Sequence, residues 1–121
     1  MFGRERIEVL MADPMHWFSV RTVVFRPREG LYEERITLWR RADTDEAADA
    51  ALSESAEYAA DVGGQDCGLA QVYEPYGDTV GGLRAAADGS EIFVLVRQSD
   101  LPPGDYLDAF FDTGREQQHS I

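Results

Sequence analysis

The chain contains no lysine, a single cysteine and only two histidines among its 121 residues. Without lysine it has no residue for a Schiff base, for a Walker A phosphate loop or for the catalytic lysine of a protein kinase. The lone Cys67 cannot form a disulfide within the chain, and the N-terminal residues resemble neither a secretory signal nor a membrane span. We therefore expect a cytoplasmic protein in a reducing compartment, with no membrane partner.

The scarcity of histidine argues against the common catalytic and metal-binding arrangements. His16 precedes the first expected strand and His119 lies in the C-terminal tail, whereas triads, dyads and two-histidine metal sites need a firmly held imidazole. A pairing of His16 with Cys67 stays open, beside the simpler interpretation of a surface histidine and a buried structural cysteine. We expect no cofactor and no metal site.

Negative charge dominates the composition, with 23 acidic against 11 basic residues and a formal net charge of −12. The charge is unevenly distributed, because residues 1–41 carry a net +2 and residues 42–121 a net −14. A strongly acidic chain repels the nucleic-acid backbone and favours solubility or a basic partner. Nucleic acid is therefore an unexpected partner.

The length and the 44% hydrophobic content predict one globular domain. Patterning starts only after Asp13-Pro14, so residues 1–15 are expected to form a loosely ordered leader and residues 115–121 a frayed tail. The domain itself should span residues 16–114.

The hydrophobic pattern predicts an α+β fold in the order ββαβ(β)βα. Expected elements are strands at 17–26, 32–41, 69–76 and 91–97, a possible short strand at 79–84, a long helix from Asp43 or Thr44 to Gly63, and a short C-terminal helix from Pro103 to Gly114. The sheet of four or five strands should be antiparallel or mixed, with the long helix on one face. Residues 91–97 are apolar on both faces, which is typical of a central strand.

Strand 32–41 poses the main problem of orientation. Alternation places Ile36 and Leu38 on one face and Trp39 on the other, and the aliphatic pair is expected to point to the core beneath the helix. The outer face would then carry tryptophan and arginine, residue types enriched at interface hot spots. This candidate interaction face consists of Trp17, Arg21, Arg35 and Trp39. The alternative is that a second layer or a second copy covers these residues.

Residues 17–58 also resemble a known family. "WFSVRTVVF" followed by "LYEERITLWRRADTDEAADAALSESAEY" is similar to the bacterial domain of unknown function 4288 family, whose members open with a Trp-Tyr-Ser type strand and carry a Tyr-Glu-Glu-Arg-Ile strand before an alanine-rich helix. Phe18 stands where tyrosine is usual, and Arg21 where lysine is common. The resemblance implies a small stand-alone domain and no established activity.

Two functions are expected. The first is a non-enzymatic protein-interaction module, a homodimer that binds a protein partner and, by analogy with other small acidic bacterial domains, resembles a toxin-neutralising immunity protein. The alternative is a small-molecule-binding protein or enzyme with a pocket around Glu34, Arg35 and Tyr73. A raised pKa of a buried Glu34 would favour the second.

Overall fold

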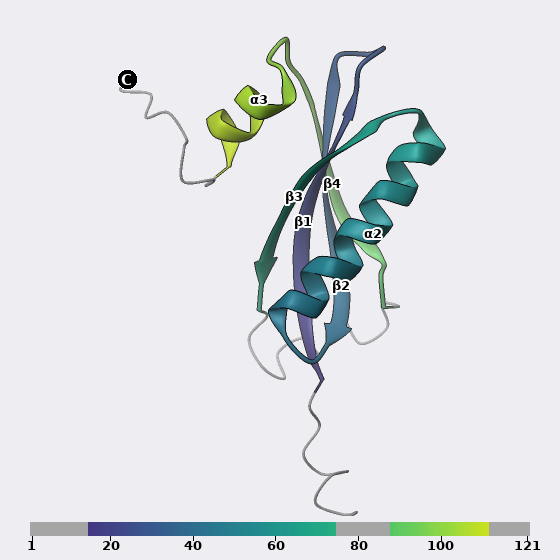
Figure 1. The fold of residues 1–121 in the computed structure, drawn as a ribbon, viewed down its shortest axis with the longest axis vertical. Helices are drawn as coiled ribbons and strands as arrows, with labels where there is room; N and C mark the ends of the chain where they lie inside the picture. The colour runs from purple at the N-terminus through teal and green to yellow at the C-terminus, as the bar shows by residue number, and fades with distance from the viewer. Residues whose placement is uncertain (1–14, 75–87, 112–121) are drawn as a thin grey trace, which may run out of the picture.

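The computed structural model describes residues 15–74 and 88–111, which form four strands and two helices (Figure 1). In chain order these are β1 (His16–Arg26), β2 (Leu31–Arg41), α2 (Thr44–Val62), β3 (Gln65–Tyr73), β4 (Glu91–Gln98) and α3 (Pro103–Phe110). The strands form one antiparallel sheet in the order β3-β1-β2-β4. The α+β fold in the order ββαββα confirms the prediction. Residues 1–14 of the expected leader 1–15, the possible strand 79–84 and the tail 115–121 lie outside the described residues.

Local sequence signals explain the ends of the long helix. The side chain of Asp43 accepts a hydrogen bond of 2.9 Å from the backbone N–H of Glu46, which caps the first turn. Gly63 ends the helix in the left-handed conformation at φ 72°, where glycine carries no steric penalty. The buried residues of the helix are all small, namely Ala47, Ala51, Ser55 and Ala59. Small side chains let the helix axis approach the strands closely.

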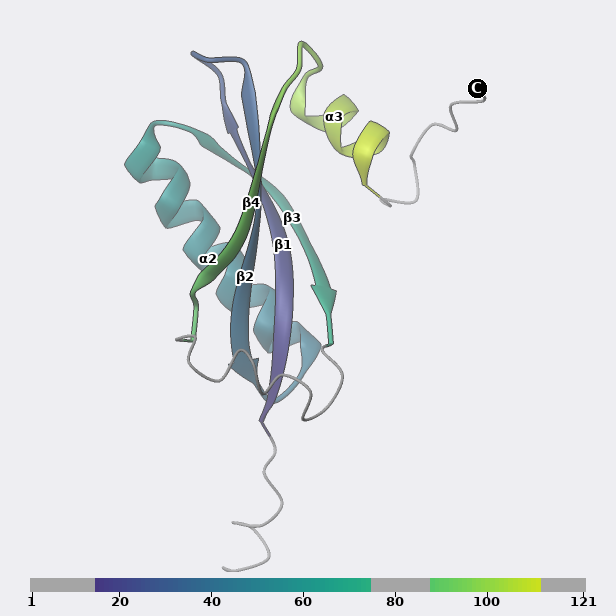
Figure 2. The same cartoon turned by 180° about the vertical axis from the view of Figure 1, so that it is seen from behind.

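The two helices lie on opposite faces of the sheet (Figures 1 and 2). Helix α2 covers one face, where Phe18, Val20 and Trp39 form a cluster with Ala47 and Ala51. Helix α3 lies against the other face, where Tyr106 and Phe111 pack with Val23 and Tyr32. The chain therefore has two small cores, one on each side of β1 and β2.

The orientation predicted for β2 is wrong. Strand β1 turns Phe18 and Val20 towards α2, and their partners across the ladder are Trp39 and Thr37. Directly paired residues share a face, so Trp39 lies beneath α2 and Leu38 lies on the opposite face. Both side chains are buried, because Leu38 is 0% exposed and Trp39 is 8% exposed. Because β2 is buried on both faces, its alternation alone does not identify the helix side.

Two other strands differ from the prediction. Strand β3 starts at Gln65 rather than 69. A register shift opposite Thr22 and Val24 accommodates Gly68 at φ 77°. Strand β4 was expected to be central, yet it pairs only with β2 and forms an edge within the described residues. Its position determines the candidate site described below.

Candidate functional site

The structure divides the predicted Trp/Arg face between the two sides of the sheet. Arg35 and Trp39 point towards α2, whereas Trp17 and Arg21 pair with Arg40 and Ile36 and point to the other side. Only Trp17 and Arg21 are partly accessible, and Arg35 is 3% exposed. The four residues therefore form no common surface, and the prediction of a single candidate interaction face is wrong.

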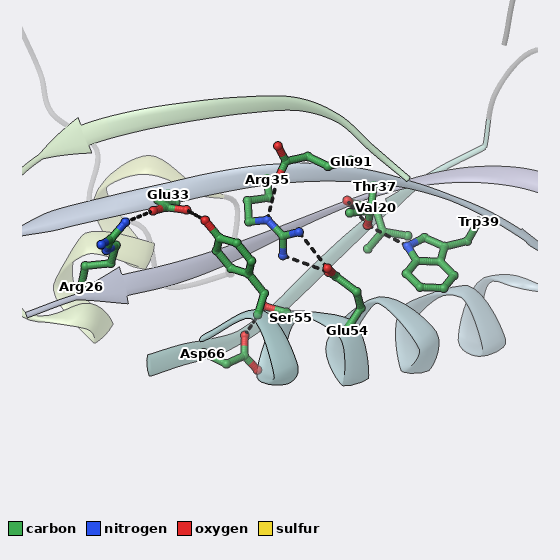
Figure 3. A network of polar contacts seen from close by, with 11 residues as sticks. Val20, Arg26, Glu33, Arg35, Thr37, Trp39, Glu54, Ser55, Asp66 and Glu91 are labelled. Carbon is green, nitrogen blue, oxygen red and sulfur yellow. Dashed lines mark hydrogen bonds and ion pairs between the residues drawn. The ribbon is translucent and has the colours of Figure 1, made fainter. Parts of the chain in front are cut away.

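Trp39 is a core residue of the α2 side. Its Nε1 donates a hydrogen bond of 2.7 Å to Thr37 Oγ1, so the polar end of the indole is satisfied inside the protein (Figure 3). The turn before β4 closes the other side, because a Cβ built on Gly89 would lie 3.2 Å from the indole ring. The indole offers no docking surface.

A polar layer fills the space between β2 and α2 next to the indole (Figure 3). It consists of Arg26, Glu33, Arg35 and Glu91 from the sheet with Glu54 and Tyr58 from the helix. Arg35 forms a two-pronged bond to Glu54, at 2.9 and 2.8 Å, and a further bond of 2.7 Å from Nε to Glu91. Glu33 accepts bonds of 2.9 Å from Arg26 and 2.5 Å from the hydroxyl of Tyr58.

Within the polar layer, Arg35 is saturated with internal partners. The guanidinium of Arg35 also lies 3.8 Å from the ring centre of Tyr58, which occupies its face as well as its edges. Burial alone would lower the pKa of Arg35, but the bonds to Glu54 and Glu91 outweigh burial and raise it. Arg35 is therefore permanently charged and fully engaged, and its role is to fix α2 on the sheet rather than to bind a ligand.

Replacing Arg35 by methionine should lower the free energy of unfolding by about 2 to 3 kcal/mol. Breaking a fully buried ion pair costs about 3 to 5 kcal/mol, but Glu54 and Glu91 are partly exposed and can regain water when the arginine is lost. Urea denaturation followed by circular dichroism measures the change. As a control, Glu57→Ala alters an exposed acid on the same helix and should leave the midpoint unchanged; equal midpoints for both variants would contradict the assigned role.

A second buried polar group occupies the opposite face around Glu34. The hydroxyl of Tyr106 donates a bond of 2.6 Å to Glu34 Oε2, and Arg97 approaches the same oxygen at 3.3 Å. Arg21 lies 3.9 Å from the other carboxylate oxygen. Burial and the bond to Glu34 raise the pKa of Tyr106. This Glu34 cluster joins α3 to β2 and β4, so the carboxylate has a structural role that accounts for its burial.

The pocket expected around Glu34, Arg35 and Tyr73 is not assembled. Glu34 and Arg35 point to opposite faces of β2, and Tyr73 lies near the end of β3, paired with Ser19 and bonded to Gln71. His16 and Cys67 lie far apart along β1, since His16 begins the strand whereas Cys67 follows Asp66, the ladder partner of Val24. Burial raises the pKa of the Cys67 thiol to about 11, far above that of a nucleophilic cysteine.

The feature that sequence reasoning missed is the exposure of β4. Five consecutive apolar residues of this strand are accessible: Ile92 at 39%, Phe93 at 54%, Val94 at 41%, Leu95 at 37% and Val96 at 52%. We call residues 92–96 the apolar edge. The sequence predicts a strand that is apolar on both faces, but it does not show that both faces are covered within one chain. The flanking charges, Glu91 and Arg97, were the only signal against that interpretation.

The described residues include no cluster of three or more side chains suited to hold a metal ion. Within the same residues, neither helix has the length and apolar character needed to cross a membrane. No protein-family model matches this chain, and no curated protein or solved structure matches it either. The resemblance to the domain of unknown function 4288 family thus stays a prediction, and function is argued from the apolar edge.

Proposed function

We propose that the chain is a non-enzymatic protein-interaction module of the cytoplasm that binds its partner along the apolar edge. The observation that carries the proposal is the run of five accessible apolar side chains on an edge strand. Exposed apolar surface of this kind marks an interaction site or an aggregation hazard. The alternative of a catalytic or small-molecule pocket has less support, because the three residues suggested for it lie on different faces or far apart along the sheet.

Main-chain geometry supports strand addition as the mode of binding. The N–H of Ser99 donates to the carbonyl of Gly30 at 3.1 Å, which makes this residue pair a hydrogen-bonded pair of the β2–β4 ladder. Hydrogen-bonded and non-bonded pairs alternate in an antiparallel ladder, so Phe93, Leu95 and Arg97 direct their main-chain groups towards β2. Val94 and Val96 direct theirs towards the open side. A partner strand finds free donors and acceptors there.

A photoreactive amino acid tests the proposal. We expect such a residue at position 93, where the phenylalanine is 54% exposed, to form protein adducts in an extract of the producing cells, with mass spectrometry identifying the adducts. The matched control carries the same residue at position 57, on the exposed side of α2, and should form none. Absence of adducts at position 93, or equal adducts at both positions, would refute the apolar edge as a binding surface.

A further inference from the structure

We infer that the partner on the apolar edge is a second copy of this chain, paired antiparallel through β4 with the two-fold axis at Val94. This inference rests on the proposed function and specifies its partner. The sequence of β4 is that of a strand in the middle of a sheet, yet one chain places it at an edge. Pairing with a second β4 makes a continuous sheet with four strands from each chain. Both copies of β4 are then central strands. The conflict between pattern and position is then removed.

The register follows from the symmetry of the sequence around Val94. Two residues on each side of Val94 are apolar, so antiparallel pairing about this residue sets Ile92 opposite Val96 and Phe93 opposite Leu95 of the second copy. Every member of the apolar edge gains an apolar cross-strand neighbour. Because the main-chain groups of Val94 point to the open side, the two Val94 residues would exchange two hydrogen bonds at the axis.

The charges at the two ends of β4 favour the antiparallel direction, in addition to their pairing with Arg35 and Glu34 inside each chain. The apolar edge carries no charged residue and is bounded by Glu91 and Arg97. Antiparallel pairing brings the acidic end of one strand to the basic end of the other, whereas parallel pairing would place like charges together. Most of the net charge of −12 resides elsewhere in the chain. Salt screens charges beyond about 8 Å at physiological ionic strength, so this charge opposes association only weakly.

The opposite edge of the sheet is formed by β3, whose outer side has no partner strand among the described residues. Strand β3 carries Asp66 and Gln71 and is interrupted near Gly68, where the ladder shifts register. Charges, polar side chains and bulges are the usual means of blocking edge-to-edge pairing. In β4 the only interruption is the bulge at Ile92, and residues 93–96 have no such protection. The contrast between the two edges indicates that the open side of β4 pairs with another strand.

Solution mass tests the inference on the purified full chain. Sedimentation equilibrium should give twice the monomer mass of 13.5 kDa. Val94→Pro removes one outward N–H at the axis and leaves the bonds to β2 in place, so it should return the monomer mass. Val94→Thr keeps the N–H and the shape and should stay dimeric. A monomeric wild type, or a dimeric proline variant with an unchanged circular dichroism spectrum, would overturn the inference.

Oxidative cross-linking tests the register in a Cys67→Ser background. A cysteine at position 94 should form an intermolecular disulfide, because hydrogen-bonded partners have Cα atoms about 5.5 Å apart, within the range that a disulfide spans. A cysteine at position 96 should not, since the two copies of residue 96 would lie about 13 Å apart along the strands. Efficient cross-linking at 96, or none at 94, would refute pairing about Val94.

The two sets of experiments separate failure of the inference from failure of the proposed function. If the chain is a monomer and the photoreactive residue at position 93 captures a different protein, the second copy is refuted as the partner. The apolar edge then remains a binding surface. If the chain is a monomer and position 93 captures nothing, both the second copy as partner and the apolar edge as a binding surface are refuted.

Discussion

Replacing Trp39 by alanine should lower the free energy of unfolding by about 3 to 5 kcal/mol, the usual cost of removing a large aromatic side chain from a core. The indole is 8% exposed and packs with Phe18, Val20, Ala47 and Ala51. Alanines on the helix cannot expand to fill the space that it leaves. The variant also deprives the Thr37 hydroxyl of its 2.7 Å donor. Urea denaturation followed by circular dichroism measures the loss.

Two variants control this experiment. Trp39→Phe keeps most of the packing and loses the indole N–H, so it should cost about 1 to 2 kcal/mol. Trp17→Ala removes a partly exposed indole on the opposite face and should cost less than Trp39→Ala. If Trp39→Ala proved as stable as the wild type, the indole would lie outside the core, as the sequence alone had suggested.

The elements of this fold are predictable because their signals are local. The cap at Asp43, the alanine-rich face and Gly63 define α2 within its own residues, and the turn before Gly30 defines the first hairpin. Which face of β2 lies beneath α2 depends instead on the elements that pack against each side of the strand. Alternation distinguishes the inner from the outer face only when one face meets water, and both faces of β2 are buried.

Polar residues of a strand usually face solvent, but those of β2 do not. Glu33 and Arg35 are buried because α2 supplies Tyr58 and Glu54 as partners. Such pairing between residues 19 and 25 positions apart has no local signature. The apolar edge was misplaced for a related reason: a strand pattern shows that both faces are apolar, but not which chain covers them.

Replacing Tyr106 by alanine should destabilise the chain by about 3 to 5 kcal/mol and release α3 from the sheet. Tyr106 is the buried residue of α3, and its ring lies 3.7 Å, centre to centre, from that of Tyr32 in a parallel stack. Hydrogen exchange should show the loss directly in the amide of Phe111, which donates to the carbonyl of Leu107 at 2.8 Å. Protection of that amide equal to the wild type would refute Tyr106 as the anchor of α3.

Tyr106→Phe isolates the hydroxyl and should cost about 1 to 3 kcal/mol, because Glu34 stays buried and loses its shortest donor. The pH dependence tests the raised pKa of Tyr106, which has burial as its first cause and the bond to Glu34 as its second. The raised pKa of Tyr106 means that the folded chain keeps the phenolic proton while the unfolded chain releases it near its ordinary pKa of about 10. Above that pH the unfolded state binds fewer protons, so the stability of the wild type falls as pH rises. The phenylalanine variant lacks this group and should lose less stability over the same alkaline range; parallel pH profiles would show that folding does not raise the pKa of Tyr106.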